Sequence, residues 1–133
     1  MRRLADRDAA LRDLRSRLEP WPDAGYLVGG AVRDALLGLP SNDYDWVVSD
    51  PRRAALGLGD ALGGSAFEMD AARRHWRVAL PDGVLHDFAP LREGATDIAG
   101  DLRLRDLTMN ALALSGLGEL HDPLGGREDL AAG

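Results

Sequence analysis

The sequence contains no cysteine and no lysine, few aromatic residues and no long apolar run. Without cysteine, the chain cannot form a disulfide and cannot offer a thiolate ligand to a metal. No apolar stretch approaches the ~20 residues that span a bilayer, so no membrane segment is predicted. The N-terminal segment is charged throughout, unlike a secretory signal. We therefore expect a cytoplasmic protein that does not associate with membranes.

The charge balance is acidic, with 22 Asp and Glu against 16 Arg and a formal net charge of −6 at pH 7. Domains that bind nucleic acid unaided usually carry a basic face, so this balance argues against a self-sufficient nucleic-acid binder. Arginine suits bidentate contacts to phosphate. The use of arginine alone is equally explained by genome base composition, which is the simpler interpretation.

The 133 residues predict one α+β domain with a mixed β-sheet. Leucines at helical spacing predict an amphipathic helix over residues 3–18 that packs on the domain. Residues 94–104 are expected to be loop with one helical turn. The other expected strands lie at 26–28, 43–48, 65–69, 74–80, 84–89 and 119–121, and the other helices at 31–37, 51–62 and 105–114. A turn at Pro81–Gly83 predicts that 74–80 and 84–89 form a hairpin.

The stretch from Gly25 to Val48 organises the chain. Within it, Asp43 and Asp45 begin a predicted strand, and alternate residues of a strand share one face. Paired carboxylates are ligands for hard cations, and two-metal phosphoryl transfer needs such a pair. Alone, an Asp-x-Asp pattern is better explained as a solvated strand edge. The preceding glycine turn favours the metal interpretation.

That turn is Gly29-Gly30, between the first strand and a short helix. Glycine lets the backbone approach closely, and N–H groups at a helix start bind phosphate, although the two glycines taken alone are better explained as a plain tight turn. Arg33 could contact the phosphate or could pair with Asp34 on the surface. Together, the turn and the carboxylate pair predict a metal-dependent site for a nucleoside triphosphate.

Two further places carry candidate residues. Asp87 lies in an apolar strand, where a carboxylate is costly unless it is paired or bound to metal; strand alternation could instead place it in solvent. The second place is the start of the predicted helix at 105–114. Its candidates are Arg105, Asp106 and Asn110, as contacts to phosphate or ribose or as simple helix-capping residues.

With these residues in place, the chain resembles the head (catalytic palm) domain of tRNA nucleotidyltransferases and bacterial poly(A) polymerases. These enzymes form the class II branch of the polymerase-β-like nucleotidyltransferase superfamily. The resemblance covers residues 25–130, after an N-terminal helix and linker at 1–22. The matching motifs are LVGGAVRDALLG at 27–38, DYD at 43–45, HDFAPLR at 86–92, RDLTMNALAL at 105–114 and HDPLGGREDL at 121–130.

The resemblance implies the polymerase-β-like palm fold and a magnesium-dependent transfer of AMP or CMP. An RNA 3′-hydroxyl, in particular that of tRNA, would attack the α-phosphate of ATP or CTP and release pyrophosphate. Asp43, Asp45 and Asp87 would be the catalytic carboxylates at two Mg²⁺ ions. The implied nucleotide-binding residues are Gly29, Gly30, Arg33, Asp34, Arg105, Asp106 and Asn110.

The sequence departs from the family pattern in two respects. Leu104 stands where the family usually has an arginine, and Leu107 where it has phenylalanine. In addition, the chain reaches Gly133 where the family's neck would begin, so we expect the base-selecting neck and the tRNA-binding body and tail to come from further domains or a partner chain. Two alternatives remain: a nucleotide- or RNA-binding module without turnover, and a small nucleotidyltransferase that modifies a protein or small molecule.

Overall fold

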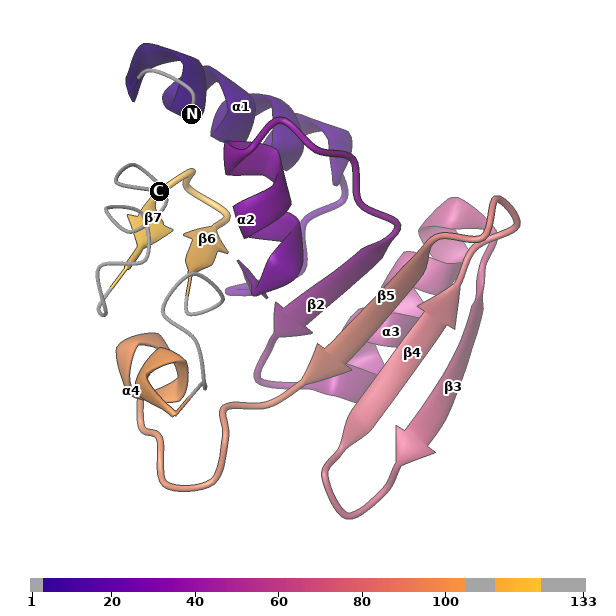
Figure 1. The fold of residues 1–133 in the computed structure, drawn as a ribbon. Helices are drawn as coiled ribbons and strands as arrows, with labels where there is room; N and C mark the ends of the chain where they lie inside the picture. The colour runs from indigo at the N-terminus through magenta and orange to yellow at the C-terminus, as the bar shows by residue number, and fades with distance from the viewer. Residues whose placement is uncertain (1–3, 105–111, 123–133) are drawn as a thin grey trace.

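The structure is a computed structural model, and it describes residues 4–104 and 112–122 (Figure 1). The four helices of this part are α1 (Leu4–Arg17), α2 (Gly30–Leu36), α3 (Pro51–Leu62) and α4 (Ile98–Arg103). The strands are β1 (Tyr26–Val28), β2 (Asp43–Val47), β3 (Ser65–Asp70), β4 (His75–Ala79), β5 (Leu85–Ala89), β6 (Ala113–Ser115) and β7 (Leu120–His121). No helix of the described part is long and apolar enough to cross a bilayer.

The strands form one sheet in the order β3-β4-β5-β2-β1-β6-β7. The β2–β5 pair is parallel and every other pair is antiparallel. The predicted mixed sheet and the hairpin of β4 with β5 are therefore confirmed. The parallel pair matters most for the site, because it places β2 in register with a strand more than 40 residues further along the chain (Tyr44 opposite His86).

One face of the sheet carries the main core. Trp46 and Phe88 are fully buried there and stack at 6.2 Å between ring centroids. Helices α1, α2 and α3 supply the covering side chains, such as Leu14, Val32 and Leu58. The expectation that the first helix packs on the domain is thus confirmed.

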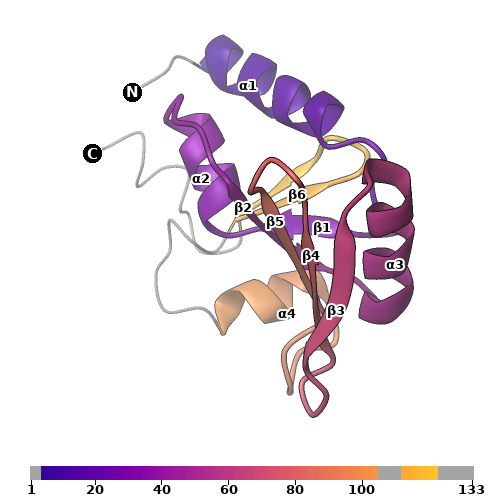
Figure 2. The ribbon, with the colours of Figure 1, turned by 90° about the vertical axis from the view of Figure 1, so that its right-hand side faces the viewer.

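The opposite face has a smaller apolar cluster. Val28 and Val47 pack there with Ile98 and Leu102 of α4. Figure 2 shows α3 and α4 on opposite sides of the sheet. The two faces therefore differ: the first is the core, and the second is apolar only beside α4, which leaves room for polar side chains on β2, β5 and β4.

Helix α3 begins and ends where the sequence predicts. Asp50 caps it by accepting a hydrogen bond from the Arg53 amide at 3.2 Å, and Pro51 occupies the first position. Gly63 ends it in the left-handed conformation (φ 69°), which glycine adopts without steric cost.

The predicted helix at 105–114 is wrong at its C-terminal end. Residues 113–115 form β6, which pairs with β1, and Ala113 and Leu114 are fully buried. A short apolar run suits a buried strand as well as a buried helix, so the periodicity of the sequence could not distinguish the two. In the structure, pairing with β1 makes these residues a strand. Residues 105–111 lie outside the described part. At 94–104, the expected helical turn is α4, capped by Asp97.

Candidate functional site

Asp43 and Asp45 occupy the same face of β2. Both are exposed, whereas Tyr44 and Trp46, which alternate with them, are buried in the core. The predicted common face of the two carboxylates is therefore present. The apolar alternates fix the orientation of the strand, because reversing it would expose Tyr44 and Trp46 and bury two charges.

Asp87 on β5 lies directly beside Asp45, because the two residues are partners in the parallel β2–β5 pairing. Its side chain is 22% exposed. His86 and Phe88, on either side of it, point into the core. The sequence left open whether this carboxylate is paired or simply solvated, and the structure shows that it is paired.

The partner of the Asp87 carboxylate is Arg77 of β4, which lies opposite Asp87 in the antiparallel β4–β5 hairpin. The guanidinium donates through Nε to Oδ1 at 2.7 Å and through Nη2 to Oδ2 at 3.1 Å. The hydrogen bond to Asp87, together with the charges of Asp87, Asp43 and Asp45, raises the pKa of Arg77 above its ordinary value. His75 of the same strand places Nε2 3.4 Å from Asp87 Oδ1.

Sequence reasoning missed Arg77. A signal was available in the hairpin register. Counting outward from the turn at Pro81–Gly83 pairs residue 79 with 85 and residue 77 with 87. An arginine opposite an aspartate on one face of a hairpin predicts an ion pair.

The residues present suit a divalent metal in their chemistry. Asp43 and Asp45 offer hard carboxylate oxygens on an exposed face, which are the ligands that Mg²⁺ prefers. Across the described ranges, however, no three His, Asp or Glu side chains form a group that could hold a metal ion. Asp87, the third expected ligand, is instead engaged by Arg77. The assignment of three carboxylates to two Mg²⁺ ions stays a prediction.

The glycine turn lies next to the carboxylate pair, since Val28 pairs with Asp45 and Gly29 follows it. Gly29 has φ 75° and ψ −140°, a conformation that favours glycine. Its N–H donates to the Leu112 carbonyl at 3.1 Å. That amide is therefore used within the fold, and the predicted phosphate contact is not tested by the structure.

Arg33 and Asp34 of α2 form an ion pair with each other. Arg33 Nη2 lies 3.0 Å from Asp34 Oδ1, and Nε lies 3.1 Å from the same oxygen. The ion pair that the sequence offered as one alternative is therefore present, between half-buried side chains, and a contact of Arg33 to phosphate stays a prediction. Arg105, Asp106 and Asn110 lie outside the described residues, so their predicted contacts have no structural counterpart here.

A cleft of about 780 Å³ opens over Asp45 and Asp87. Arginines that the sequence did not single out line it: Arg73 and Arg74 in the β3–β4 turn, and Arg92 after β5. Arg74 donates through Nη2 to the Ser49 carbonyl at 3.2 Å. A cleft with carboxylates and with several arginines has the charges needed to bind a metal–polyphosphate complex.

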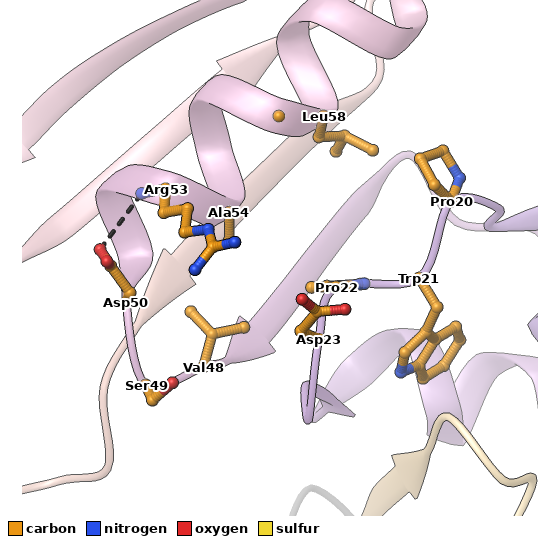
Figure 3. A pocket seen from close by; sticks show the side chains of 11 residues that line it. Pro20, Trp21, Pro22, Asp23, Val48, Ser49, Asp50, Arg53, Ala54 and Leu58 are labelled. Carbon is orange, nitrogen blue, oxygen red and sulfur yellow. Dashed lines mark hydrogen bonds between the residues drawn. The ribbon is translucent and has the colours of Figure 1, made fainter.

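A second hollow, of about 320 Å³, lies between the loop after α1 and the start of α3 (Figure 3). Its lining includes Trp21, Asp23, Val48 and Arg53. None of the predicted site residues borders it. The carboxylates of the first cleft and the residues of this hollow therefore form two separate features.

The buried histidine at position 86 is structural. Its Nδ1 accepts a hydrogen bond from Trp46 Nε1 at 3.0 Å, and its ring stacks on Tyr44. Burial lowers the pKa of His86 to about 4. Trp21 packs edge-on against Trp46, with 4.7 Å between the ring centroids, so both tryptophans pack within the fold.

Residues 25–133 match the Poly A polymerase head domain family. The chain belongs to this family. The expected family and the expected fold are thereby confirmed. The head domain superposes on a CCA-adding enzyme solved with CTP with a TM-score of 0.80, at 29% identity, over 98% of this chain and 35% of that one.

Curated relatives give the same result. The head domain is 49% identical over 116 residues to an A-adding tRNA nucleotidyltransferase of Deinococcus radiodurans, and this alignment covers 87% of this chain and 26% of the relative. It is 52% identical over 113 residues to a CC-adding tRNA nucleotidyltransferase of Geobacter sulfurreducens, and this alignment covers 80% of this chain and 25% of the relative. The chain thus spans about a quarter of the length of the curated relatives it matches.

Proposed function

We propose that this head domain binds a nucleoside triphosphate with divalent metal and transfers the nucleotidyl group to the 3′ end of an RNA, in particular tRNA. The observation that best supports this proposal is that Asp43 and Asp45 share the exposed face of β2, beside Asp87, in a chain of this family. Solved relatives support the ligands: one is complexed with CTP, and another with a primer tRNA and an incoming ATP analog.

In this proposal, Asp43 and Asp45 hold two Mg²⁺ ions, with Asp87 as the third carboxylate. When bound, the metal would stabilise the attacking and leaving oxygens of the transfer. The RNA 3′-hydroxyl attacks the α-phosphate, and pyrophosphate leaves. Arg73, Arg74 and Arg92 supply positive charge around the phosphate chain.

Titration calorimetry with MgATP and MgCTP tests the proposal. Asp43→Asn and Asp45→Asn keep the side-chain shape but remove the charge, so we expect each to weaken triphosphate binding by at least ~10-fold. Asp60→Asn is the matched control, because Asp60 is exposed on α3, on the other side of the sheet. Wild-type affinity in both Asp43→Asn and Asp45→Asn would show that the site is elsewhere.

A second candidate is a module that binds nucleotide without turnover, favoured by the engagement of Asp87 with Arg77. Incorporation of labelled AMP or CMP into RNA primers separates the two. Incorporation that is lost in Asp45→Asn supports the transferase. Metal-dependent nucleotide binding without incorporation supports the module.

A further inference from the structure

The third carboxylate of the proposed metal site is held by an arginine through both of its oxygens. Both oxygens of Asp87 accept hydrogen bonds from Arg77, at 2.7 and 3.1 Å, in the fork geometry that makes such pairs strong. The pair is only partly solvated, since the Arg77 side chain is 29% exposed and that of Asp87 is 22% exposed. Solvent and salt therefore screen it less than a pair on the open surface.

The pair lies in a row of side chains across three strands. Arg77 on β4 is the partner of Asp87 on β5, and Asp87 is the partner of Asp45 on β2. Partners in adjacent strands lie about 5 Å apart at Cβ and share a face. The guanidinium thus stands one strand beyond the carboxylates that would hold the metal.

We propose that Arg77 is a resident counter-ion that competes with the divalent cation for Asp87. In the metal-free head domain it neutralises one of three neighbouring carboxylates and occupies both oxygens of that one. A cation that binds Asp87 competes with the guanidinium for these two oxygens and meets its positive charge. Arg77 therefore acts on the metal through Asp87 and weakens cation binding before the nucleotide arrives. The inference rests on the proposed function, because it places the metal at Asp43 and Asp45.

The competing explanation is that Arg77 only orients Asp87. The two explanations predict opposite signs. If Arg77 orients a ligand, its removal weakens cation binding, as loss of a supporting hydrogen bond does at metal sites. If Arg77 competes, its removal strengthens cation binding, because an acidic site loses a positive charge and regains a carboxylate. The backbone of Asp87 is already held between β2 and β4, so any ordering that Arg77 supplies is confined to the two side-chain torsions of Asp87.

Binding of Mn²⁺ alone, without nucleotide, measures this sign. The fraction of unbound Mn²⁺ is read by electron paramagnetic resonance with wild type, Arg77→Met, Arg77→Lys and Arg12→Met. We expect Arg77→Met to bind Mn²⁺ roughly 3- to 10-fold more tightly, which is the Coulomb effect of one charge at this range in a partly solvated site. Arg77→Lys keeps the charge and should stay closer to wild type. Arg12, exposed on α1, controls for net charge.

Equal or weaker Mn²⁺ binding by a folded Arg77→Met would overturn the inference, as would equal tightening by Arg12→Met. Asp45→Asn in the same assay separates this failure from that of the proposed function. If Asp45→Asn abolishes Mn²⁺ binding while Arg77→Met leaves it unchanged, the metal site stands and only the role of Arg77 fails. If Asp45→Asn leaves binding intact, the metal site itself is wrong.

A measurement on the wild-type protein covers the case in which Arg77→Met does not fold. The Arg77 Nε–H signal in a ¹H–¹⁵N spectrum reports the 2.7 Å bond to Asp87. Saturation with Mg²⁺ should shift this signal and speed its exchange with water, because the bond is broken. A signal that is unchanged at saturation would contradict displacement.

Discussion

Two adjacent residues of β5, His86 and Asp87, lie in different environments because their side chains point to opposite faces of the sheet. His86 points into the core and is 3% exposed, and Asp87 points to the opposite face, where Arg77 binds it. His86 satisfies Trp46 Nε1 by accepting its hydrogen bond, which requires the imidazole Nδ1 to be unprotonated. Burial and this bond both favour the neutral ring.

The first prediction concerns the pH dependence of stability. The pKa of His86 is about 4 in the folded protein against an ordinary value of 6.5, so the unfolded chain takes up a proton that the folded chain refuses. The free energy of unfolding should therefore fall between about pH 6.5 and pH 4, by about 2 kcal/mol between pH 7.5 and pH 5. Urea unfolding at the two pH values measures it.

His86→Gln provides the comparison, since it removes the titrating group but keeps an acceptor for Trp46. Its loss of stability over the same pH interval should be smaller than that of the wild type by the same amount. Parallel losses in both proteins would show that His86 is not responsible.

Sequence reasoning predicted the residues whose position follows from their own strand. The common face of Asp43 and Asp45 follows from alternation with Tyr44 and Trp46. Arg77 could not be found this way, because its role depends on a register between two strands rather than on its own neighbours. Two arginines at the cleft, Arg73 and Arg74, depend on how loops meet in three dimensions, and no local pattern marks them.

At the scale of elements, two of the glycines in α3 and the following turn, Gly57 and Gly64, have different roles. A Cβ at Gly57 would meet nothing within 4 Å, whereas one at Gly64 would lie 2.7 Å from Leu80 Cδ2 and 3.0 Å from the Ala79 carbonyl oxygen. Gly57 is therefore a helix-interior glycine that is not required by packing, while Gly64 is required by the close approach of β4.

The second prediction follows from this contrast. Gly57→Ala should stabilise the protein by about 0.5–1 kcal/mol, because alanine loses less backbone entropy in a helix. Gly64→Ala should destabilise it by about 1–3 kcal/mol, because β4 must shift. Urea unfolding of the two variants measures both changes, and equal signs would contradict this interpretation of the packing.

Most elements were predicted because their ends carry local signals, such as Asp50 and Gly63 around α3. The strand β6 was not predicted, because its conformation is set by pairing with β1, more than 80 residues away in sequence. The sequence also gave no reason to expect β2 to pair in parallel with β5. Local patterns therefore predicted elements with capped ends, and they did not predict features that depend on pairing between distant strands.

At the scale of the whole molecule, the sheet separates two environments. The face packed by α1, α2 and α3 is the core, and the opposite face carries the carboxylates, Arg77 and the 780 Å³ cleft. The charged side chains at this cleft suit phosphate and metal, and its apolar lining, such as Val47 and Leu91, offers no side-chain hydrogen bond that could distinguish one base from another. We therefore expect ATP and CTP to bind this chain with similar affinity in the presence of Mg²⁺.

Calorimetry with the two triphosphates tests this third prediction. The matched control is the corresponding pair of diphosphates, which should bind more weakly and again without preference. A strong preference for one base would show that this chain contains a base-selecting contact, and the charged cleft alone would then be an incomplete description of the site.

The most direct test of the central claim is to locate the bound nucleotide. In ¹H–¹⁵N spectra of the protein with ATP, a trace of Mn²⁺ broadens the amide signals near the metal. We predict broadening at Asp43, Asp45 and Asp87, with little effect around the second hollow at Trp21 and Arg53. Broadening centred on that hollow, with β2 and β5 unaffected, would contradict the proposed site.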